Sequence, residues 1–172
     1  VANGIHELYE PLADDSGMTL HVKAVSTLLH GNRELISQAL ANLVENAIKY
    51  GKPVPLTQPL STGAGTGNKA ILIEARRDGV QVLLSVTDHG PGIPEADRNH
   101  AVERFVRLEA SRSQPGSGLG LSLAAAVATL HGGELRLGDA HPGLIATLAI
   151  PAPAVVNGRL AVQMPDVPQK MV

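Results

Sequence analysis

The chain has 172 residues, a formal net charge of −2, no cysteine and only 2% aromatic residues. The lack of cysteine excludes disulfides, thiolate zinc sites and cysteine nucleophiles, and the charge and aromatic content give no basis for binding nucleic acid. The longest apolar run, residues 121–130, is shorter than the ~20 residues that span a bilayer, so we expect no direct membrane insertion of this chain.

Hydrophobic periodicity predicts four helices and five strands that form one domain over residues 1–151. The helices are expected at 4–16, 33–50, 95–104 and 119–131, and the strands at 19–25, 69–76, 80–87, 134–138 and 144–150. Segment 51–68 is rich in Pro, Gly, Ser and Thr and should be a surface loop, and 152–172 should be a tail. Helices and strands in separate runs, with hairpins, favour an α+β two-layer sandwich over a parallel βαβ fold.

The helix over 33–50 carries a polar stripe beside its apolar face. Asn42, Asn46, Lys49 and Tyr50 follow one another at positions i, i+4, i+7 and i+8. An asparagine oxygen is a suitable ligand for Mg²⁺, and a lysine is a suitable charge for a phosphate. Taken alone, the stripe fits an ordinary amphipathic helix equally well.

The segment DHGPGIP, residues 88–94, follows an apolar strand. Asp88 can accept a hydrogen bond from an exocyclic amine such as that of adenine, and Gly90 and Gly92 allow a flat ligand to approach the backbone closely. The alternative is a common Asp/Gly turn at the end of a strand.

A third glycine-rich segment opens the helix at 119–131. Gly116, Gly118 and Gly120 would leave the first N–H groups of that helix, and the positive end of its dipole, open to a phosphate chain. The spacing is not that of a P-loop, and a closely packed helix gives the same pattern.

The order and spacing of these three segments resemble the catalytic and ATP-binding domain of bacterial sensor histidine kinases, in the superfamily of gyrase, chaperone and mismatch-repair ATPases. Residues 42–51 resemble the N box of that family, 88–94 its first glycine box, 102–113 its F box and lid, and 116–124 its second glycine box. The resemblance implies a Bergerat-type fold: a mixed, mostly antiparallel sheet with helices on one face and a mobile ATP lid at 104–117.

The resemblance implies ATP and Mg²⁺ as cofactors and a role for each matching residue. Asn46 would ligate the metal, Lys49 would bind a phosphate, and these two with Asn42 would be the catalytic residues. Asp88 would bind the adenine amine, Phe105 would anchor the lid, and Arg107 or Arg112 would approach the γ-phosphate. The implied nucleotide contacts are Asn46, Lys49, Tyr50, Asp88, Gly90, Gly92, Ile93, Phe105, Arg107, Arg112, Gly116, Gly118, Leu119 and Gly120.

Asn42 separates the branches of the superfamily. Its hydrolases carry a glutamate at that place, and a carboxamide cannot act as a general base at neutral pH. The substitution therefore favours phosphoryl transfer to a histidine over a gyrase-type ATP-driven clamp. A nucleotide-binding regulatory pseudokinase is the main alternative, and the presence of Asn46, Lys49 and Asp88 argues against it.

None of the seven histidines stands in the acceptor motif of the family, and the residues after His6 do not match it. The resemblance therefore implies that the phosphoacceptor histidine lies on another domain of the same protein, absent here, with a response regulator downstream in two-component signal transduction. It also implies a cytoplasmic position, in a parent protein that can be anchored in the inner membrane. One departure from the family is Leu144, which follows Gly143 where a hydroxyl residue is usual.

Overall fold

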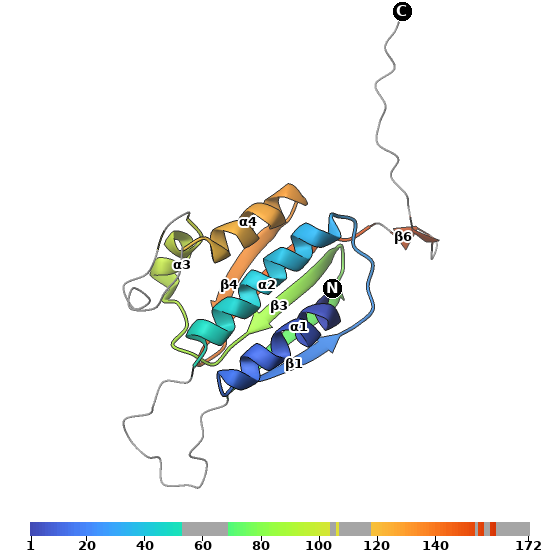
Figure 1. Ribbon diagram of the computed structural model, residues 1–172. Coiled ribbons are helices and arrows are strands. Elements are labelled where there is room, and N and C mark those ends of the chain that lie inside the picture. Colours follow the sequence, from blue (N-terminus) through green and yellow to red (C-terminus); the bar gives the residue numbers. More distant parts are fainter. Residues whose placement is uncertain (53–68, 104–105, 107–117, 154, 157–158, 161–172) are drawn as a thin grey trace, which may run out of the picture.

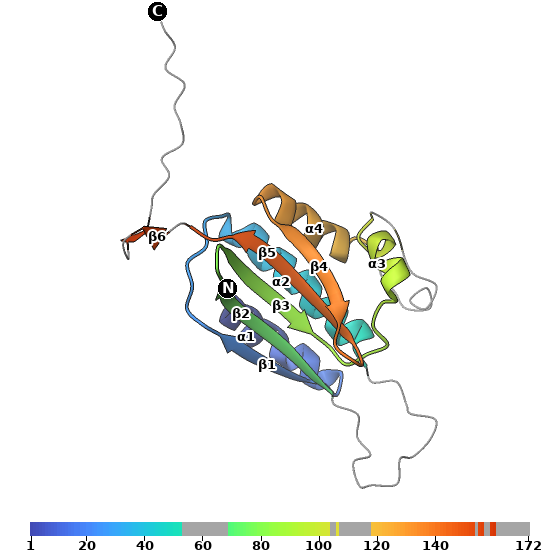
Figure 2. The same ribbon diagram turned by 180° about the vertical axis from the view of Figure 1, so that it is seen from behind.

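The computed structural model describes residues 1–52, 69–103, 106, 118–153, 155–156 and 159–160. Its helices are α1 (Ala2–Asp15), α2 (Arg33–Tyr50), α3 (Glu95–Ala101) and α4 (Gly120–Leu130), and its strands are β1 (Thr19–Ala24), β2 (Ala70–Asp78), β3 (Gln81–Thr87), β4 (Glu134–Asp139), β5 (Leu144–Pro151), β6 (Val155–Val156) and β7 (Arg159–Leu160). Helices α1, α2 and α4 cover one face of the main sheet (Figure 1), and the strands are in front when the molecule is seen from behind (Figure 2). Helix α3 lies beyond the edge at β4.

The main sheet has five strands in the order β1-β2-β3-β5-β4. β1 and β2 are parallel because the chain crosses from one to the other through α2, and the remaining pairs are antiparallel. The predicted α+β two-layer sandwich with a mixed, mostly antiparallel sheet is confirmed. No helix in the described part of the chain is both long and apolar enough to cross a bilayer.

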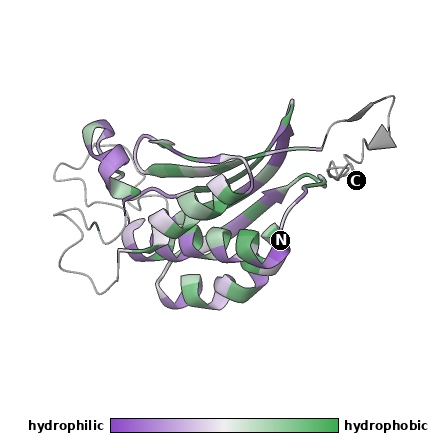
Figure 3. Ribbon diagram, turned by 90° about the horizontal axis from the view of Figure 1, so that it is seen from above, coloured by the Kyte–Doolittle hydropathy of each residue, from purple (hydrophilic) through white to green (hydrophobic). Residues whose placement is uncertain are grey.

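The core lies between the sheet and the helices. Figure 3 shows largely hydrophobic strands beside helices that carry both hydrophobic and hydrophilic residues. The largest side chains with less than 2% exposure are Leu40, Leu43, Val44, Ile71, Ile73, Val82, Leu148 and Ile150. Full burial of each such side chain contributes about 1.5–3 kcal/mol, so this aliphatic layer holds the fold together without a large aromatic residue.

Both ends of α2 are set by local chemistry. The Asn32 side chain accepts a hydrogen bond from the Leu35 N–H at 2.9 Å and so caps the N-terminal end of the helix. Gly51 ends the helix, and its N–H donates to the Ala47 carbonyl at 2.8 Å. The apolar face of α2 is thereby held on the sheet, and its C-terminal end is placed beside the segment that follows β3.

Two expectations from the sequence differ in detail or lie outside the described residues. In the segment expected to be a tail, β6 and β7 pair as two short antiparallel strands, and two-residue strands are too short to give a periodic pattern. The predicted helix at 95–104 ends at Ala101 in α3. The surface loop from residue 53 to 68 and nearly all of the predicted lid at 104–117 lie outside the described residues.

Candidate nucleotide-binding site

The C-terminal end of α2 lies directly against the loop that follows β3. A Cβ atom added to Gly51 would lie 2.6 Å from the Cβ of Asp88, and one added to Gly90 would lie 2.8 Å from the Cα of Gly51 and overlap the Tyr50 carbonyl oxygen. Only glycine permits such close contact between two backbones. The C-terminal turn of α2 and the glycine-rich loop 88–94 are distant in sequence. They nevertheless form one continuous wall of the candidate site.

Asp88 is the main buried charged group of this wall. It is 8% exposed, and its Oδ1 accepts hydrogen bonds from the N–H groups of Gly90 at 2.9 Å and Leu144 at 3.3 Å. Burial raises the pKa of the Asp88 carboxyl above its usual value, while these two N–H groups and His89 act in the opposite direction. With Oδ1 bonded to the protein, Oδ2 is the oxygen placed to accept a hydrogen bond from a ligand.

The turn between β4 and β5 forms the base below Asp88. A Cβ on Gly92, whose φ is 69°, would lie 2.8 Å from the carbonyl oxygen of Gly143, and a Cβ on Gly143 would overlap the carbonyl oxygen of Asp88. The Asp88 N–H also donates to the Leu144 carbonyl at 3.0 Å. Leu144 thus supports Asp88 through both of its backbone groups, although it lacks the side-chain hydroxyl usual at this place.

The start of α4 lies against the polar stripe of α2. A Cβ on Gly120 would lie 3.0 Å from Nδ2 and 3.3 Å from Oδ1 of Asn46. Leu119, at the N-cap, makes no side-chain capping bond, and Gly118 before it has a φ of 71°. The Leu119 side chain therefore does not cap the first N–H groups of α4, which begin next to the Asn46 carboxamide.

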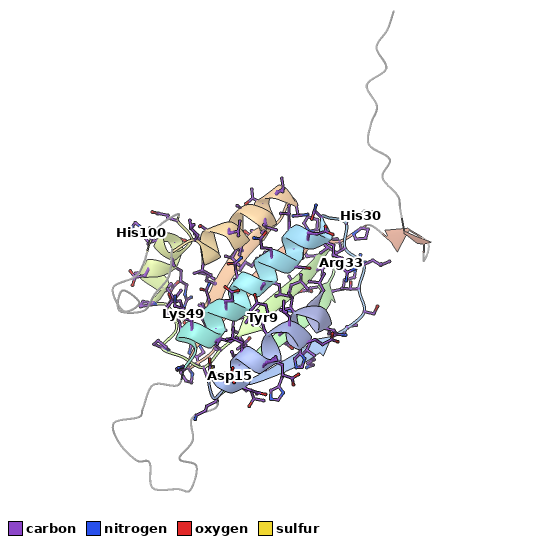
Figure 4. The ribbon with its side chains drawn as sticks, in the orientation of Figure 1. Tyr9, Asp15, His30, Arg33, Lys49 and His100 are labelled. Carbon is purple, nitrogen blue, oxygen red and sulfur yellow. The ribbon has the colours of Figure 1, made fainter. Side chains whose placement is uncertain are left out.

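The other polar residues of α2 have different surroundings; Figure 4 labels Lys49, near the C-terminal end of this helix, and Tyr9 on the neighbouring α1. The Lys49 Nζ lies 5.0 Å from the centroid of the Tyr50 ring, a cation–π distance. The Asn42 Nδ2 donates to the Gln38 carbonyl of its own helix at 2.8 Å. Glu45 accepts a hydrogen bond from the Tyr9 hydroxyl at 2.6 Å, so its carboxylate is bonded to α1 and does not supply the general base that Asn42 lacks.

The structure therefore brings together most of the residues expected from the sequence. Three adjoining elements carry them: α2, the loop that follows β3, and the start of α4. The residues on these elements are Asn46, Tyr50, Asp88, Gly90, Gly92, Gly118, Leu119 and Gly120. Phe105, Arg107, Arg112 and Gly116 lie outside the described residues, and their roles stay predictions. The approach of Gly143 to Asp88 is not predicted from the sequence, in which the Pro142-Gly143 turn is the available signal.

Comparison with known proteins identifies this arrangement. The family described as histidine kinase-, DNA gyrase B- and HSP90-like ATPases matches residues 31–154, which include all three adjoining elements. The chain belongs to this ATPase family. Over 122 aligned residues, the chain is 38% identical to the signal transduction histidine-protein kinase/phosphatase MprB of Mycobacterium sp. (strain KMS). The match covers 71% of this chain and 21% of that protein, so the chain spans about a fifth of the length of the relative.

Solved structures agree with that assignment to the ATPase family. A mycobacterial sensor histidine kinase MprB has a TM-score of 0.68 and 27% identity, and the match covers 88% of this chain and 91% of that one. Full-length ShkA in complex with AMPPNP has a TM-score of 0.66 and 25% identity, with 89% of this chain and 30% of that one covered. The resemblance to the histidine kinase catalytic domain, inferred from three short segments, is confirmed.

Proposed function

We propose that this domain binds ATP with Mg²⁺ and transfers the γ-phosphoryl group to a histidine on a separate phosphoacceptor domain, in two-component signalling. The observation that carries the proposal is the convergence of three groups suited to three parts of ATP. These are the buried Asp88 carboxylate, the Asn46 carboxamide and the N-terminal start of α4. The structural neighbour ShkA, whose structure holds AMPPNP, supports the choice of an adenine nucleotide.

Asp88 would bind the adenine end of the nucleotide. Its Oδ2 would accept a hydrogen bond from the exocyclic amine, while its Oδ1 stays fixed by Gly90 and Leu144. A hydrogen bond to a charged, buried acceptor contributes about 1.5–3 kcal/mol. Because guanine presents a carbonyl in place of that amine, the same carboxylate would disfavour guanine nucleotides.

Asn46, Lys49 and the first turn of α4 would bind the phosphate end. The described residues contain no group of three or more His, Cys, Asp or Glu side chains that could hold a metal. Mg²⁺ commonly keeps several waters and binds through substrate phosphates with few protein ligands, so a single asparagine oxygen fits it. The ion, when bound, would neutralise charge on the phosphates, and Lys49 would leave its position over Tyr50 to reach them.

The proposed reaction needs little acid–base chemistry from this domain. The bond from the γ-phosphorus to its bridging oxygen breaks, a bond to an imidazole nitrogen of the acceptor forms, and ADP leaves. A neutral imidazole already has a lone pair, so no general base is required, and Asn42 supplies none. The contribution of the domain would be placement and charge stabilisation.

The proposal is tested with radiolabelled ATP and Mg²⁺, using this chain alone and with a separately purified dimerisation and phosphoacceptor domain of a related histidine kinase. We expect acid-labile label on the added domain and none on this chain. Asn46→Ala should lower the rate roughly 100-fold, since it removes a group that stabilises the transferred charge. Gln38→Ala, which removes a carboxamide of the same helix outside the site, is the matched control.

Three outcomes would oppose the proposal. Acid-labile label on this chain alone would place an acceptor histidine within it. Failure of the wild-type chain to bind ADP in calorimetry would remove the nucleotide site altogether. Tight ADP binding with no label on any acceptor domain tried would favour the regulatory pseudokinase instead.

A further inference from the structure

Arg98, on α3, connects the loop that follows Asp88 with the end of β4. Its Nε donates to the carbonyl of Ile93 at 3.0 Å, and its Nη2 lies 2.6 Å from Oδ2 of Asp139. Ile93 is in the glycine-rich loop that follows Asp88, and Asp139 is the last residue of β4. The Arg98 side chain is 17% exposed and that of Asp139 is 47% exposed, so solvent reaches the ion pair from the Asp139 side and the geometry of the contacts matters more than the charge attraction.

Apolar packing holds α3 only weakly against the sheet. A cavity of about 390 Å³ lies between α3 and β4, lined by Asn99 and Val102 on one side and Leu135 and Leu137 on the other. Ala101 is the only buried residue of α3. In the described part of the chain, the contact of Arg98 with Asp139 therefore links α3 to the end of β4, and its contact with Ile93 links α3 to the loop that follows Asp88.

We propose that Arg98 is a positioning residue that sets nucleotide affinity by fixing the Ile93 loop against the turn between β4 and β5. This inference rests on the proposed function of the site. The same loop and turn also meet where Gly92 packs on Gly143 and where Leu144 bonds to Asp88. A shift of the turn would move the Leu144 N–H and release Oδ1 of Asp88, which would rotate the carboxylate out of line with an adenine amine.

The two acceptors make arginine, and not merely a positive charge, necessary at this position. A guanidinium presents several N–H donors in a planar fork, so one side chain can serve the Ile93 carbonyl and the Asp139 carboxylate together. A lysine ammonium on a flexible stem would satisfy one of them at the cost of the other. Arg98→Lys should therefore keep most of the attraction to Asp139 and lose the geometry.

The test compares Arg98→Lys and Arg98→Ala with Arg136→Lys and Arg136→Ala. Arg136, which lines the same cavity, is the matched control because it also bridges two partners, Glu134 at 2.7 Å and Gln81 at 3.2 Å, and neither partner belongs to the Ile93 loop or to the turn between β4 and β5. ADP affinity is measured by calorimetry with and without Mg²⁺, thermal unfolding is recorded for each variant, and amide exchange is followed at Leu144. We expect ADP affinity to fall roughly threefold for Arg98→Lys and roughly tenfold for Arg98→Ala.

Both Arg98 variants should speed amide exchange at Leu144 and reduce ADP affinity by the same factor with and without Mg²⁺, because the adenine end is affected. Arg136 variants should bind ADP like the wild type. A wild-type chain that fails to bind ADP would defeat the proposed function itself. If the wild type binds and Arg98→Lys equals Arg136→Lys in affinity and exchange, Arg98 does not position the site. A loss seen only with Mg²⁺ would mean that Arg98 acts on the phosphate end, which also overturns the inference.

Discussion

The two faces of α2 differ in their contacts, since one face packs in the core and the other carries the polar stripe proposed to bind the nucleotide. On the apolar face, Leu40, Leu43 and Val44 are almost completely buried against the sheet. On the polar stripe, Asn42 bonds to its own helix and Lys49 lies over the ring of its neighbour Tyr50. The stripe thus makes little contact that holds the helix to the sheet, whereas the apolar face makes most of it.

Because the two faces make different contacts, substitutions on one face should change stability and substitutions on the other should change affinity. Residues of the apolar face contribute free energy to folding because they leave water when the domain folds. Residues of the stripe are half-buried in the empty domain, and their polar atoms can turn to a ligand without breaking the core. Changes on the first face should lower stability, and changes in the site that adjoins the stripe should lower affinity.

The largest expected effect comes from Leu40→Ala in the centre of the apolar face. Removal of a fully buried leucine leaves a cavity, and we expect the free energy of unfolding to fall by about 2–5 kcal/mol. Urea denaturation followed by circular dichroism measures it. Leu8→Ala on α1, where the leucine is 68% exposed, is the control and should change stability by less than about 0.5 kcal/mol. Equal effects of the two substitutions would mean that this face is not the core.

Asp88→Asn should have opposite effects on binding and on stability: ADP should bind more weakly, and the nucleotide-free protein should be more stable at pH 7. We expect ADP binding to weaken by about 1.5–3 kcal/mol, because the amide cannot accept as the carboxylate does. Burial raises the pKa of Asp88 above 3.8, the value taken for the unfolded chain. Stability therefore falls as the pH rises from 3.8 through the folded-state pKa, and at pH 7 the ionised group opposes folding. The empty Asn variant should then be the more stable protein at pH 7.

Thermal unfolding of the nucleotide-free proteins between pH 7 and pH 4 checks the predicted effect of Asp88→Asn on stability. The advantage of Asp88→Asn should shrink as the pH approaches 3.8, where the wild-type carboxyl becomes protonated in both states. Asp78→Asn is the control, since that side chain is 63% exposed at the end of β2. An Asp88→Asn variant that is less stable at pH 7 and retains its ADP affinity would contradict both the burial argument and the site.

The fold could be predicted from the sequence because its signals are local. The alternation in 80–87 and the long apolar face of 33–50 depend only on neighbouring residues, and both elements were found within a residue or two of the predicted bounds. The short strands β6 and β7 contain too few residues to alternate. The helix expected to run to 104 ends at Ala101, where polar residues of α3 gave no clear boundary.

The candidate site was predictable as a set of motifs but not as a set of contacts. Asn46 and Asp88 stood out because their residue types and spacing match a chemistry. The packing of Gly143 on Asp88 depends on the register of β5 against β3, and the bridge made by Arg98 depends on how α3 sits beyond β4. Such long-range geometry leaves no periodic trace in a sequence. The hydrogen bond between Tyr9 on α1 and Glu45 on α2 likewise depends on how the two helices pack, which the sequence does not indicate.

The smallest expected effect concerns that last pair, on a side of α2 that is neither core nor site. The Tyr9 hydroxyl donates to Glu45 Oε1 at 2.6 Å, and burial, together with the hydrogen bond and charge of Glu45, raises the pKa of Tyr9 from 10.0 to about 12. Tyr9→Phe should lower the free energy of unfolding by about 0.5–1.5 kcal/mol at pH 7. ADP affinity should be unchanged, although Glu45 directly precedes Asn46.

The pH dependence gives this prediction its sign. Because the folded-state pKa is raised, the contribution of Tyr9 is fully present below pH 10 and is lost as the pH rises through about 12. The stability difference between wild type and Tyr9→Phe should therefore decline in urea titrations above pH 10. When Glu45→Gln is present, which keeps a hydrogen-bond acceptor but removes the charge, the stability contribution of Tyr9 should decline less above pH 10. If Tyr9→Phe instead weakened ADP binding, α1 would be coupled to Asn46 through Glu45, and the separation between the binding stripe and the rest of α2 would fail.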